Sequence, residues 1–425
     1  MVRTPAAPPA DADLPRARAL FDPSSAAVVL DRFLRPRGWD LAEVRPVQAI
    51  YRPGRSCTVR YRAHARGPDG SRWLSLCAAT RLRPLEAVPV APDFGARFGL
   101  ADPIETWDGI TVWAYPYDPV LAGLPDAAHA PTVRAASRVE GSTAFAVTPV
   151  RYRPMQRAVL RYLVLSGGGP RRVRFGKVLR DDAFERTFQA HRNLRRTRIA
   201  RSVPRVVTSV ENLVIFEPMT GRDLRALLKD GSRLPSPGRV TDLMTRVAGA
   251  AWSGEAKPRR PGRAVRDAAS LLSHVLPERS AEIAGLAAEL AERADGTCAG
   301  PTIHGDLYEA QIFVDERHRL GLIDLEDAGP GDPLLDAANF LSHLATLSVS
   351  DPRTQGRPLA YRALLRRAML DALGGSEAEL AWRESLSMLL LATGPFRVLS
   401  SDWPRKVAAR VDATARLLDR SSRAA

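Results

Sequence analysis

The stretch TIHGDLYEAQIFVDERHRLGLIDLEDAGPGDP, residues 302–333, decides the fold because it holds two aspartates at the ends of short apolar runs. Asp306 follows the first run, and Asp324 closes a second run eighteen residues later. The turn DERHR at 315–319 predicts a β-hairpin between the two aspartates. Because a hairpin returns the chain to its starting point, we expect the carboxylates of Asp306 and Asp324 to lie close together.

A carboxamide, Gln311, lies on the same predicted loop as Asp306. Carboxylate and amide oxygens are the ligands that Mg²⁺ prefers in proteins. With Asp324 and Gln311 on the metal, Asp306 remains free to orient a hydroxyl group, as in phosphoryl transfer. The pattern therefore indicates a magnesium–nucleotide site.

The chain has 425 residues, enough for two or three domains, and a formal net charge of +15. Most of the excess lies in residues 151–205, which hold sixteen Arg or Lys residues and three acidic residues. Such a basic segment suits phosphate groups, and nucleic acid is one possible partner. The segment lacks the interleaved aromatic residues of a single-strand binder, and it has no helix-turn-helix pattern, so nucleic acid is an unlikely partner.

The sequence gives no sign of export or of a membrane span. It contains no run of eighteen apolar residues, and its first twenty residues lack the apolar core of a secretory signal. A cytoplasmic location without a membrane partner is therefore expected. The three cysteines, Cys57, Cys77 and Cys298, have no metal-ligand spacing, so they are interpreted as reduced apolar residues.

Two segments of the chain resemble each other at an offset of about a hundred residues. YRPGRSCTVRYR at 51–62 matches YRPMQRAVLRYL at 152–163, and VRPV at 44–47 matches VTPV at 147–150. Each copy reads as a small antiparallel sheet of alternating strands. A helical pattern follows the third strand of the second copy only, through Phe184, Phe188, His191 and Leu194. We expect the first copy to be degenerate, with a structural role and no bound nucleotide.

From about residue 237 onward the pattern changes to helices rich in Ala and Leu, and the fold class predicted from the whole layout is α+β. The expected organisation is a disordered N-terminus at 1–15, a degenerate β domain at 16–130, a nucleotide-binding lobe at 131–228, and a helical lobe with the catalytic loop at 229–425.

HGDLYEAQ at 304–311 and IDLEDAGPGDPLLDAANFL at 323–341 together resemble the aminoglycoside phosphotransferase and choline kinase family, relatives of the protein kinases. The usual form in that family is HGDxxxxN followed by IDxxxxxxGDP. The likeness spans about residues 140–420. It implies a two-lobed protein-kinase-like fold, with an antiparallel N-lobe and a helical C-lobe, here preceded by a degenerate duplicate of the N-lobe sheet.

The resemblance assigns roles to the residues of the two motifs. Asp306 matches the catalytic aspartate, which accepts or orients the proton of the acceptor hydroxyl, and Asp324 matches the metal-binding aspartate. Gln311 stands where the family has asparagine as the second metal ligand. The extra methylene moves the amide oxygen by about 1.5 Å, and Mg²⁺ tolerates misplacement poorly.

The resemblance also implies a nucleotide site. Lys177, inside the strand-like run VRFGKVL, matches the lysine that contacts phosphates, and lysine is rare in this arginine-rich chain. The alternative is a strand lysine that faces solvent. Glu185 is the carboxylate expected to pair with Lys177. Backbone groups from Glu217 to Met219 match the hinge that binds an adenine edge.

Three polar residues of the motifs are expected to be structural. His304 can be read as a metal ligand or a base, but in this family it braces the catalytic loop. Asp332 and Asp336 precede and begin a helical run, where aspartates commonly act as caps and loop braces.

The expected function is an ATP- and Mg²⁺-dependent small-molecule kinase that transfers a γ-phosphoryl group to a hydroxyl. The alternative is a nucleotide-binding pseudokinase that acts as a regulatory or binding module. Residues 331–425 hold thirteen bases and ten acids, a poor match for a polycationic acceptor, so we expect no aminoglycoside resistance. Acceptor identity, ATP versus GTP and oligomeric state are left open.

Overall fold

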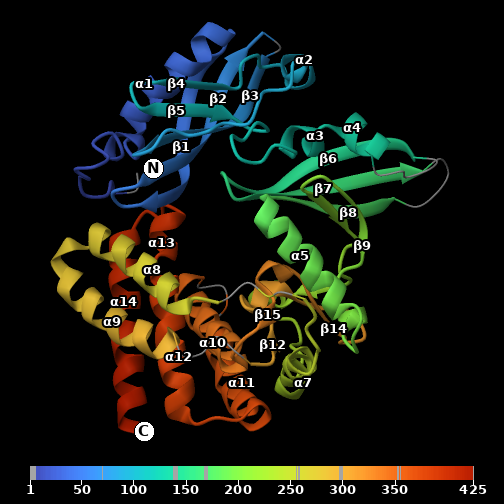
Figure 1. Ribbon diagram of the computed structural model, residues 1–425, viewed down its shortest axis with the longest axis vertical. Coiled ribbons are helices and arrows are strands. Elements are labelled where there is room, and N and C mark those ends of the chain that lie inside the picture. The colour runs from blue at the N-terminus through green and yellow to red at the C-terminus, as the bar shows by residue number, and fades with distance from the viewer. Residues whose placement is uncertain are drawn as a thin grey trace.

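The computed structural model describes residues 6–68, 70–136, 142–166, 171–254, 256, 259–295, 300–351, 354 and 356–424 (Figure 1). Two five-stranded antiparallel sheets come first, and most of the helices follow them. The predicted α+β class, with antiparallel sheets ahead of a helical part, is confirmed.

The first sheet has the strand order β1-β2-β3-β5-β4. Before it, α1 (Pro23–Leu34) begins at Asp22, whose carboxylate accepts a hydrogen bond from Ser25 N at 2.8 Å. Such a cap satisfies a free N–H of the first helical turn. The strands and short helices of this sheet are β1 (Asp40–Arg52), β2 (Ser56–Gly67), β3 (Gly70–Arg81), α2 (Phe94–Phe98), β4 (Ile104–Trp107) and β5 (Ile110–Ala114).

The second sheet repeats the first, in the order β6-β7-β8-β10-β9. Both first strands shift register just after the matched prolines, between Pro46 and Gln48 and between Pro149 and Arg151. The equivalent bulges agree with the internal repeat seen in the sequence. The elements are α3 (Leu124–Ala128), α4 (Ala130–Ala136), β6 (Ser142–Arg153), β7 (Arg157–Ser166), β8 (Arg172–Leu179), α5 (Asp181–Leu194), β9 (Val206–Val210) and β10 (Leu213–Phe216).

The remaining chain is mainly helical, and no helix among the described residues is long and apolar enough to cross a membrane. Its last helices pack against one another, with α12 between α10 and α14. The helices are α6 (Leu224–Asp230), α7 (Pro237–Ala248), α8 (Pro261–Val275), α9 (Ser280–Asp295), α10 (Pro333–Ser350), α11 (Arg357–Leu373), α12 (Glu377–Ala392), α13 (Gly394–Arg397) and α14 (Trp403–Ala424).

Short strands interrupt these helices where the sequence predicts the hairpin. β13 (Ile312–Val314) and β14 (Leu320–Leu322) pair antiparallel, and β11 (Arg222–Asp223) extends them. β12 (Thr302–Ile303) pairs with β15 (Gly329–Pro330). Single 3₁₀ turns complete the fold: η1 (Arg18–Leu20), η2 (Arg35–Arg37), η3 (Ala200–Ser202), η4 (Pro277–Arg279), η5 (Glu309–Gln311) and η6 (Leu325–Asp327).

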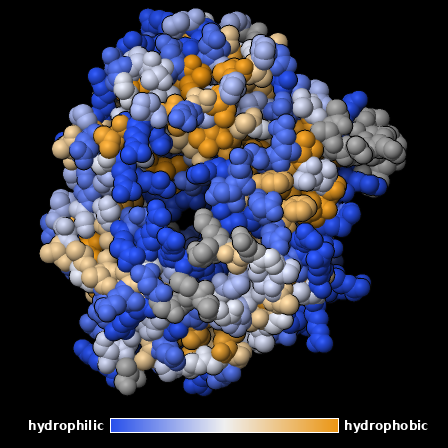
Figure 2. All heavy atoms as spheres, viewed as in Figure 1, coloured by the Kyte–Doolittle hydropathy of each residue, from blue (hydrophilic) through white to orange (hydrophobic). Residues whose placement is uncertain are grey.

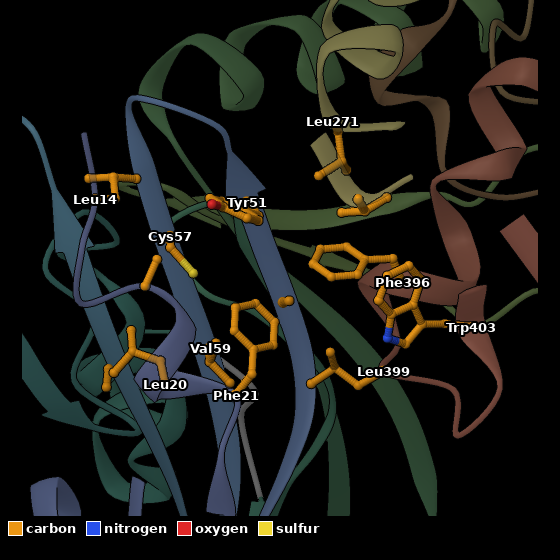
Figure 3. Close-up of a cluster of buried hydrophobic side chains, with 14 of the residues drawn as sticks. Leu14, Leu20, Phe21, Tyr51, Cys57, Val59, Leu271, Phe396, Leu399 and Trp403 are labelled. Carbon is orange, nitrogen blue, oxygen red and sulfur yellow. The ribbon is translucent and has the colours of Figure 1, made fainter. Parts of the chain in front are cut away.

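The first sheet shares a hydrophobic core with the C-terminal helices (Figure 3). Phe396 of α13 packs against Phe21 and Tyr51, with ring centroids 5.6 and 6.2 Å apart. Trp403 contacts the ring of Phe396 in a T-shaped arrangement, with the centroids 5.1 Å apart. Cys57 is buried in this core as an unpaired thiol. Because apolar burial drives folding, the first sheet is an integral part of the structure.

The expected N-terminal disorder does not extend to residues 6–15. Asp11 accepts hydrogen bonds from Tyr51 Oη at 2.8 Å and Gly54 N at 2.9 Å, and Leu14 is buried in the shared core. The Pro- and Ala-rich composition suggested a free tail, but these two side chains dock the segment onto the first sheet. Residues 1–5 lie outside the described residues.

A buried carboxylate joins the two sheets. Asp118, which follows β5, accepts hydrogen bonds from Tyr152 Oη at 2.7 Å and Met155 N at 2.8 Å in the second sheet. It also accepts from Val120 N and Leu121 N at 2.9 and 3.0 Å. The first sheet thus holds the turn between β6 and β7.

We expect Asp118→Ala to lower the free energy of unfolding by about 2–4 kcal/mol, because it leaves several buried donors without acceptors. Denaturant unfolding measures this effect, with Asp267→Ala at an exposed position of α8 as control. A change below about 0.5 kcal/mol, the range of ordinary surface substitutions, would contradict the role of Asp118.

Candidate active site

The hairpin brings the two predicted aspartates together. Asp306 follows β12 and Asp324 follows β14, where Asp324 adopts a left-handed backbone with φ 67°. Burial raises the pKa of Asp306 to about 7, and the neighbouring charges of Asp324 and Asp327 add to the rise. A carboxyl group with this pKa is suited to accept a proton near neutral pH.

The loop that carries Asp306 is braced from α10. Asp336 accepts hydrogen bonds from His304 N at 2.6 Å and Gly305 N at 2.8 Å. The buried ring of His304 bonds through Nε2 to the carbonyl of Ile323 at 2.9 Å. Gly305 has φ +87°, and a Cβ there would lie 2.1 Å from the carbonyl oxygen of Asp327, so only glycine fits. These contacts support the structural reading of His304 and Asp336.

Asp332 caps α10, as the sequence predicts. Its side chain accepts a hydrogen bond from Leu334 N at 2.9 Å and pairs with Arg383 Nε at 2.5 Å. It thereby fixes the start of the helix that supplies Asp336.

Lys177 points from β8 towards the hairpin. Its Nζ pairs with Asp324 Oδ1 and, at 2.7 Å, with Glu326 Oε1, and its side chain is only 13% exposed. Arg157, at the start of β7, bonds the same two carboxylates at 3.2 and 2.6 Å. Two cations from the second sheet therefore meet two acids from the helical part.

The charges at this junction are strongly coupled. Burial alone would raise the pKa of Asp324, but the charges of Lys177 and Arg157 outweigh burial and hold that pKa well below its ordinary value. Burial alone would lower the pKa of Lys177, but Asp324 and Glu326 outweigh it and raise that pKa. Asp324 and Lys177 are therefore both charged at neutral pH.

Gln311 lies at the end of η5, beside Asp324. Its Nε2 donates to Asp324 Oδ2 at 3.4 Å. Its carbonyl oxygen Oε1 is buried and has no hydrogen-bond partner among the described residues. A buried amide oxygen without a donor carries a desolvation cost, which a metal ion at that position would remove. Gln311 therefore offers a free amide oxygen to a metal, and a turn of its amide group would bring that oxygen to the side of Asp324, where the nitrogen now lies.

The pair predicted between Lys177 and Glu185 is not formed. Glu185 is exposed on α5, and Lys177 is paired instead with Asp324 and Glu326. On the same helix, Gln189 donates to the carbonyl of Ser253 at 2.7 Å. The orientation of α5 therefore turns its carboxylate away from the lysine.

The predicted hinge follows β10, which pairs with β8 so that Val214 is opposite Lys177. Glu217 N donates to the carbonyl of Arg205 at 2.9 Å, so that amide is already used. The side chain of Met219 lies against β14, where a Cβ on Gly321 would be 2.1 Å from Met219 Cε. The segment from Glu217 to Met219 thus lies at the junction of the second sheet and the hairpin.

Residues 154–381 match the family model described as "Phosphotransferase enzyme family". The chain belongs to this family. The resemblance drawn from the HGDLYEAQ and IDLEDAGPGDP motifs is confirmed, and so is a two-lobed protein-kinase-like fold. No match is found among curated protein sequences.

Several solved structures of phosphotransferases are similar to parts of the chain. A choline kinase from Streptococcus pneumoniae is 14% identical, with a TM-score of 0.44, over 68% of this chain and 97% of that one. A choline/ethanolamine kinase family protein from Mesorhizobium loti is 16% identical, with a TM-score of 0.44, over 69% and 96%. A thermostable mutant of an aminoglycoside phosphotransferase, in ternary complex with AMP-PNP and hygromycin B, is 17% identical, with a TM-score of 0.44, over 68% and 96%. The family assignment rests on the family model alone.

A cavity of about 570 Å³ opens beside Asp306 in this phosphotransferase. In the view of Figure 2, a hollow bordered mainly by hydrophilic residues lies near the centre of the molecule. The wall of the 570 Å³ cavity includes Asp306, Asn339 and His343 together with apolar side chains of α12. Asn339 Nδ2 donates to Asp306 Oδ1 at 3.4 Å and to the carbonyl of Leu307 at 3.0 Å. A small molecule in this cavity has direct access to Asp306.

Sequence reasoning missed two residues of the candidate site, Glu326 and Arg157. Glu326 lies two residues after Asp324 in IDLED, so a second carboxylate on the same loop was a usable signal. Arg157 sits in the turn RPMQRA among many arginines, and its sequence carries no signal that separates it from the others.

Proposed function

We propose that this chain is an ATP- and Mg²⁺-dependent phosphotransferase that moves the γ-phosphoryl group to a hydroxyl of a small molecule other than an aminoglycoside. The observation that carries the proposal is the convergence of Lys177, Asp324 and Gln311 beside Asp306 and its cavity. Lys177 comes from β8 and the other three residues from the stretch 302–333, and their types match the needs of phosphoryl transfer.

Asp306 is the proposed base. The acceptor oxygen forms a bond to the γ-phosphorus while the bond from that phosphorus to the bridging oxygen breaks and ADP leaves. The hydroxyl proton passes to the carboxylate of Asp306, whose raised pKa favours the transfer. Asn339 and the brace from Asp336 keep the carboxylate in position.

Asp324, Glu326 and the Oε1 of Gln311 would hold Mg²⁺. Bound Mg²⁺ neutralises the phosphate charge that develops during transfer. No cluster of three or more His, Cys, Asp or Glu side chains suited to a metal occurs among the described residues. Two carboxylates with an amide are nevertheless an adequate set, because Mg²⁺ commonly takes its remaining ligands from water and phosphates.

Lys177 is the proposed phosphate contact, and Arg157 is a second one. In the structure both cations neutralise Asp324 and Glu326. The same cations lie where they can turn to phosphate oxygens when those acids hold a metal. After β10, the Glu217 carbonyl and the Met219 amide are the backbone groups proposed to meet the adenine.

The ATP dependence is tested by incubating the protein with Mg²⁺-ATP and a panel of hydroxyl compounds while ADP is measured. The proposal predicts ADP formation that requires both Mg²⁺ and an acceptor. The alternative function, a nucleotide-binding pseudokinase, is favoured by glutamine in place of asparagine at 311. It predicts that Mg²⁺-ATP raises the melting temperature although no acceptor gives turnover.

Activity is expected to rise with pH through about 7. Asp306 must be unprotonated to accept the hydroxyl proton, and its pKa in the free protein is about 7. Because kcat/KM reports ionisations of the free enzyme, its pH profile measures this group directly. A profile that stays flat between pH 5 and pH 8 would contradict a base with a pKa near 7.

Gln311→Asn is expected to raise the Mg²⁺ concentration for half-maximal activity by about 10- to 100-fold, the range seen when metal sites are disturbed. The shorter side chain withdraws the whole amide group from Asp324 by about 1.5 Å. Gln311→Glu keeps the length and the oxygen, so it is the control and should retain tight Mg²⁺ dependence. An asparagine variant with an unchanged or lower Mg²⁺ requirement would contradict the assignment.

A further inference from the structure

The wall of the cavity carries a guanidinium without an acidic partner. Arg397 is the last residue of α13 and lines the cavity together with Asp306. Among the described residues its side chain makes no ion pair with a carboxylate. Burial lowers the pKa of Arg397, and the nearby charge of Arg151 adds to that effect. A desolvated cation without a counter-ion is costly, so such groups are commonly paired.

The surroundings of Arg397 add positive charge and no compensating acid. Arg410 of α14 is also desolvated, and its Nη1 donates to the carbonyl of Leu391, a residue of the cavity wall. Burial lowers the pKa of Arg410 to about 10. His343, on the same wall, is held neutral because burial, with help from Arg225 and Arg410, lowers its pKa to about 3. The positive charges of Arg397 and Arg410 therefore favour an anion beside Arg397.

Four carboxylates line the cavity, those of Asp306, Glu326, Asp327 and Asp336, and two of them are satisfied elsewhere. Asp336 accepts from the two backbone N–H groups of His304 and Gly305. Glu326 pairs with Lys177 and Arg157. Neither of them is available as a partner for the guanidinium of Arg397.

Part of the lining is apolar. Trp252 and the leucines of α12, Leu386 and Leu390, belong to the same cavity wall as Asp306 and Arg397. A cavity of about 570 Å³ falls within the usual size range for a small-molecule site. The cavity therefore offers apolar surface to a carbon skeleton and charged side chains to polar groups.

We propose that the acceptor is a hydroxylated organic acid, whose anionic group pairs with Arg397 while its hydroxyl reaches Asp306. This inference rests on the proposed phosphotransferase function and adds the chemical class of its acceptor. The anionic group is a carboxylate or a phosphate-like group, because a guanidinium binds both in the same two-pronged manner. Cationic acceptors are disfavoured by the same charge.

The test compares ω-hydroxyalkanoates of increasing chain length with the ω-hydroxyalkanamides and ω-amino alcohols of equal length. The ω-hydroxyalkyl phosphonates form a separate arm that distinguishes a phosphate-like group from a carboxylate. ADP formation gives kcat/KM for each probe with Mg²⁺-ATP. We expect an acid to exceed its amide by about 10-fold or more, the effect of one charge-assisted hydrogen bond.

Arg397→Gln should abolish the preference for the acid over the amide, and Arg397→Lys should keep part of it because the charge remains. Arg405→Gln, which removes an exposed arginine of α14, is the matched control and should leave the preference intact. If the natural protein phosphorylates the amide with the same kcat/KM as the acid, the inference is overturned. It is also overturned if Arg397→Gln keeps the preference for the acid.

A binding measurement separates failure of this inference from failure of the proposed function. Calorimetric titration of the ω-hydroxyalkanoates into the natural protein and into Arg397→Gln needs no turnover. If an acid binds in an Arg397-dependent way and no probe gives ADP, the acidic-ligand site stands and the phosphotransferase proposal fails. If no acid binds and none is phosphorylated, the acidic-ligand site is refuted.

Discussion

Asp306→Asn is expected to lower kcat by about 10²- to 10⁴-fold, the usual contribution of a positioned base. The amide of asparagine cannot accept the hydroxyl proton, yet it keeps the size of the side chain. Binding of Mg²⁺-ATP should change little, because the proposed metal and phosphate contacts lie on Asp324, Gln311 and Lys177. Single-turnover ADP formation and calorimetric binding of the nucleotide measure the two quantities separately.

The stability of the same variant gives an independent check. The pKa of Asp306 is raised to about 7 in the folded protein, above its ordinary 3.8, so the folded state binds this proton more tightly than the unfolded state. Its stabilising contribution is present below about pH 4 and is lost as pH rises through about 7. Asp306→Asn should therefore gain stability relative to the natural protein between pH 4 and pH 7. Asp371→Asn, an exposed position on α11, should change neither activity nor this pH dependence.

Lys177→Met is expected to lower kcat/KM for ATP by about 10²- to 10³-fold, the range for loss of one donor that stabilises developing charge. Methionine has a similar length, but it has no charge for the phosphates. The substitution also leaves Asp324 and Glu326 with Arg157 as their remaining cation, so the variant should be less stable. Steady-state kinetics with varied ATP and denaturant unfolding measure the two effects.

Two comparisons keep the Lys177 result interpretable. Lys177→Arg retains the charge and should recover the stability while it recovers only part of the activity, because a planar fork replaces a compact ammonium group. Lys229→Met removes a lysine that pairs with Asp351 at 2.9 Å, away from the proposed site. If Lys177→Met is as active as Lys229→Met, the assignment of Lys177 to the nucleotide site is wrong.

Much of the candidate site follows from local rules of the chain. A hairpin of two short strands returns Asp324 to the neighbourhood of Asp306 whatever surrounds it. Gln311 precedes the first strand of that hairpin, so its position is fixed with it. The two sheets were predictable for a different reason, because the internal repeat preserved even the proline that marks the bulge in each first strand.

The partners of Lys177 were not predictable in this way. Glu185 was chosen because it is on the helix after the strand, but the rotation of α5 leaves it exposed. That rotation depends on packing between elements, which no local pattern records. Arg157 and Arg397 likewise gain their significance from tertiary packing. The docking of residues 6–15 also depends on distant partners, since Tyr51 and the C-terminal helices supply their contacts.

The most direct test of the account is a crystal structure of the protein with Mn²⁺ and the ATP analogue AMP-PNP, in which anomalous scattering locates the metal. The account predicts a metal peak ligated by Asp324 and the amide oxygen of Gln311, with the phosphates beside Lys177 and the γ-phosphate facing Asp306. A nucleotide bound elsewhere would contradict the account. So would a metal that lacks Asp324 as a ligand while Lys177 remains paired with Asp324 and Glu326.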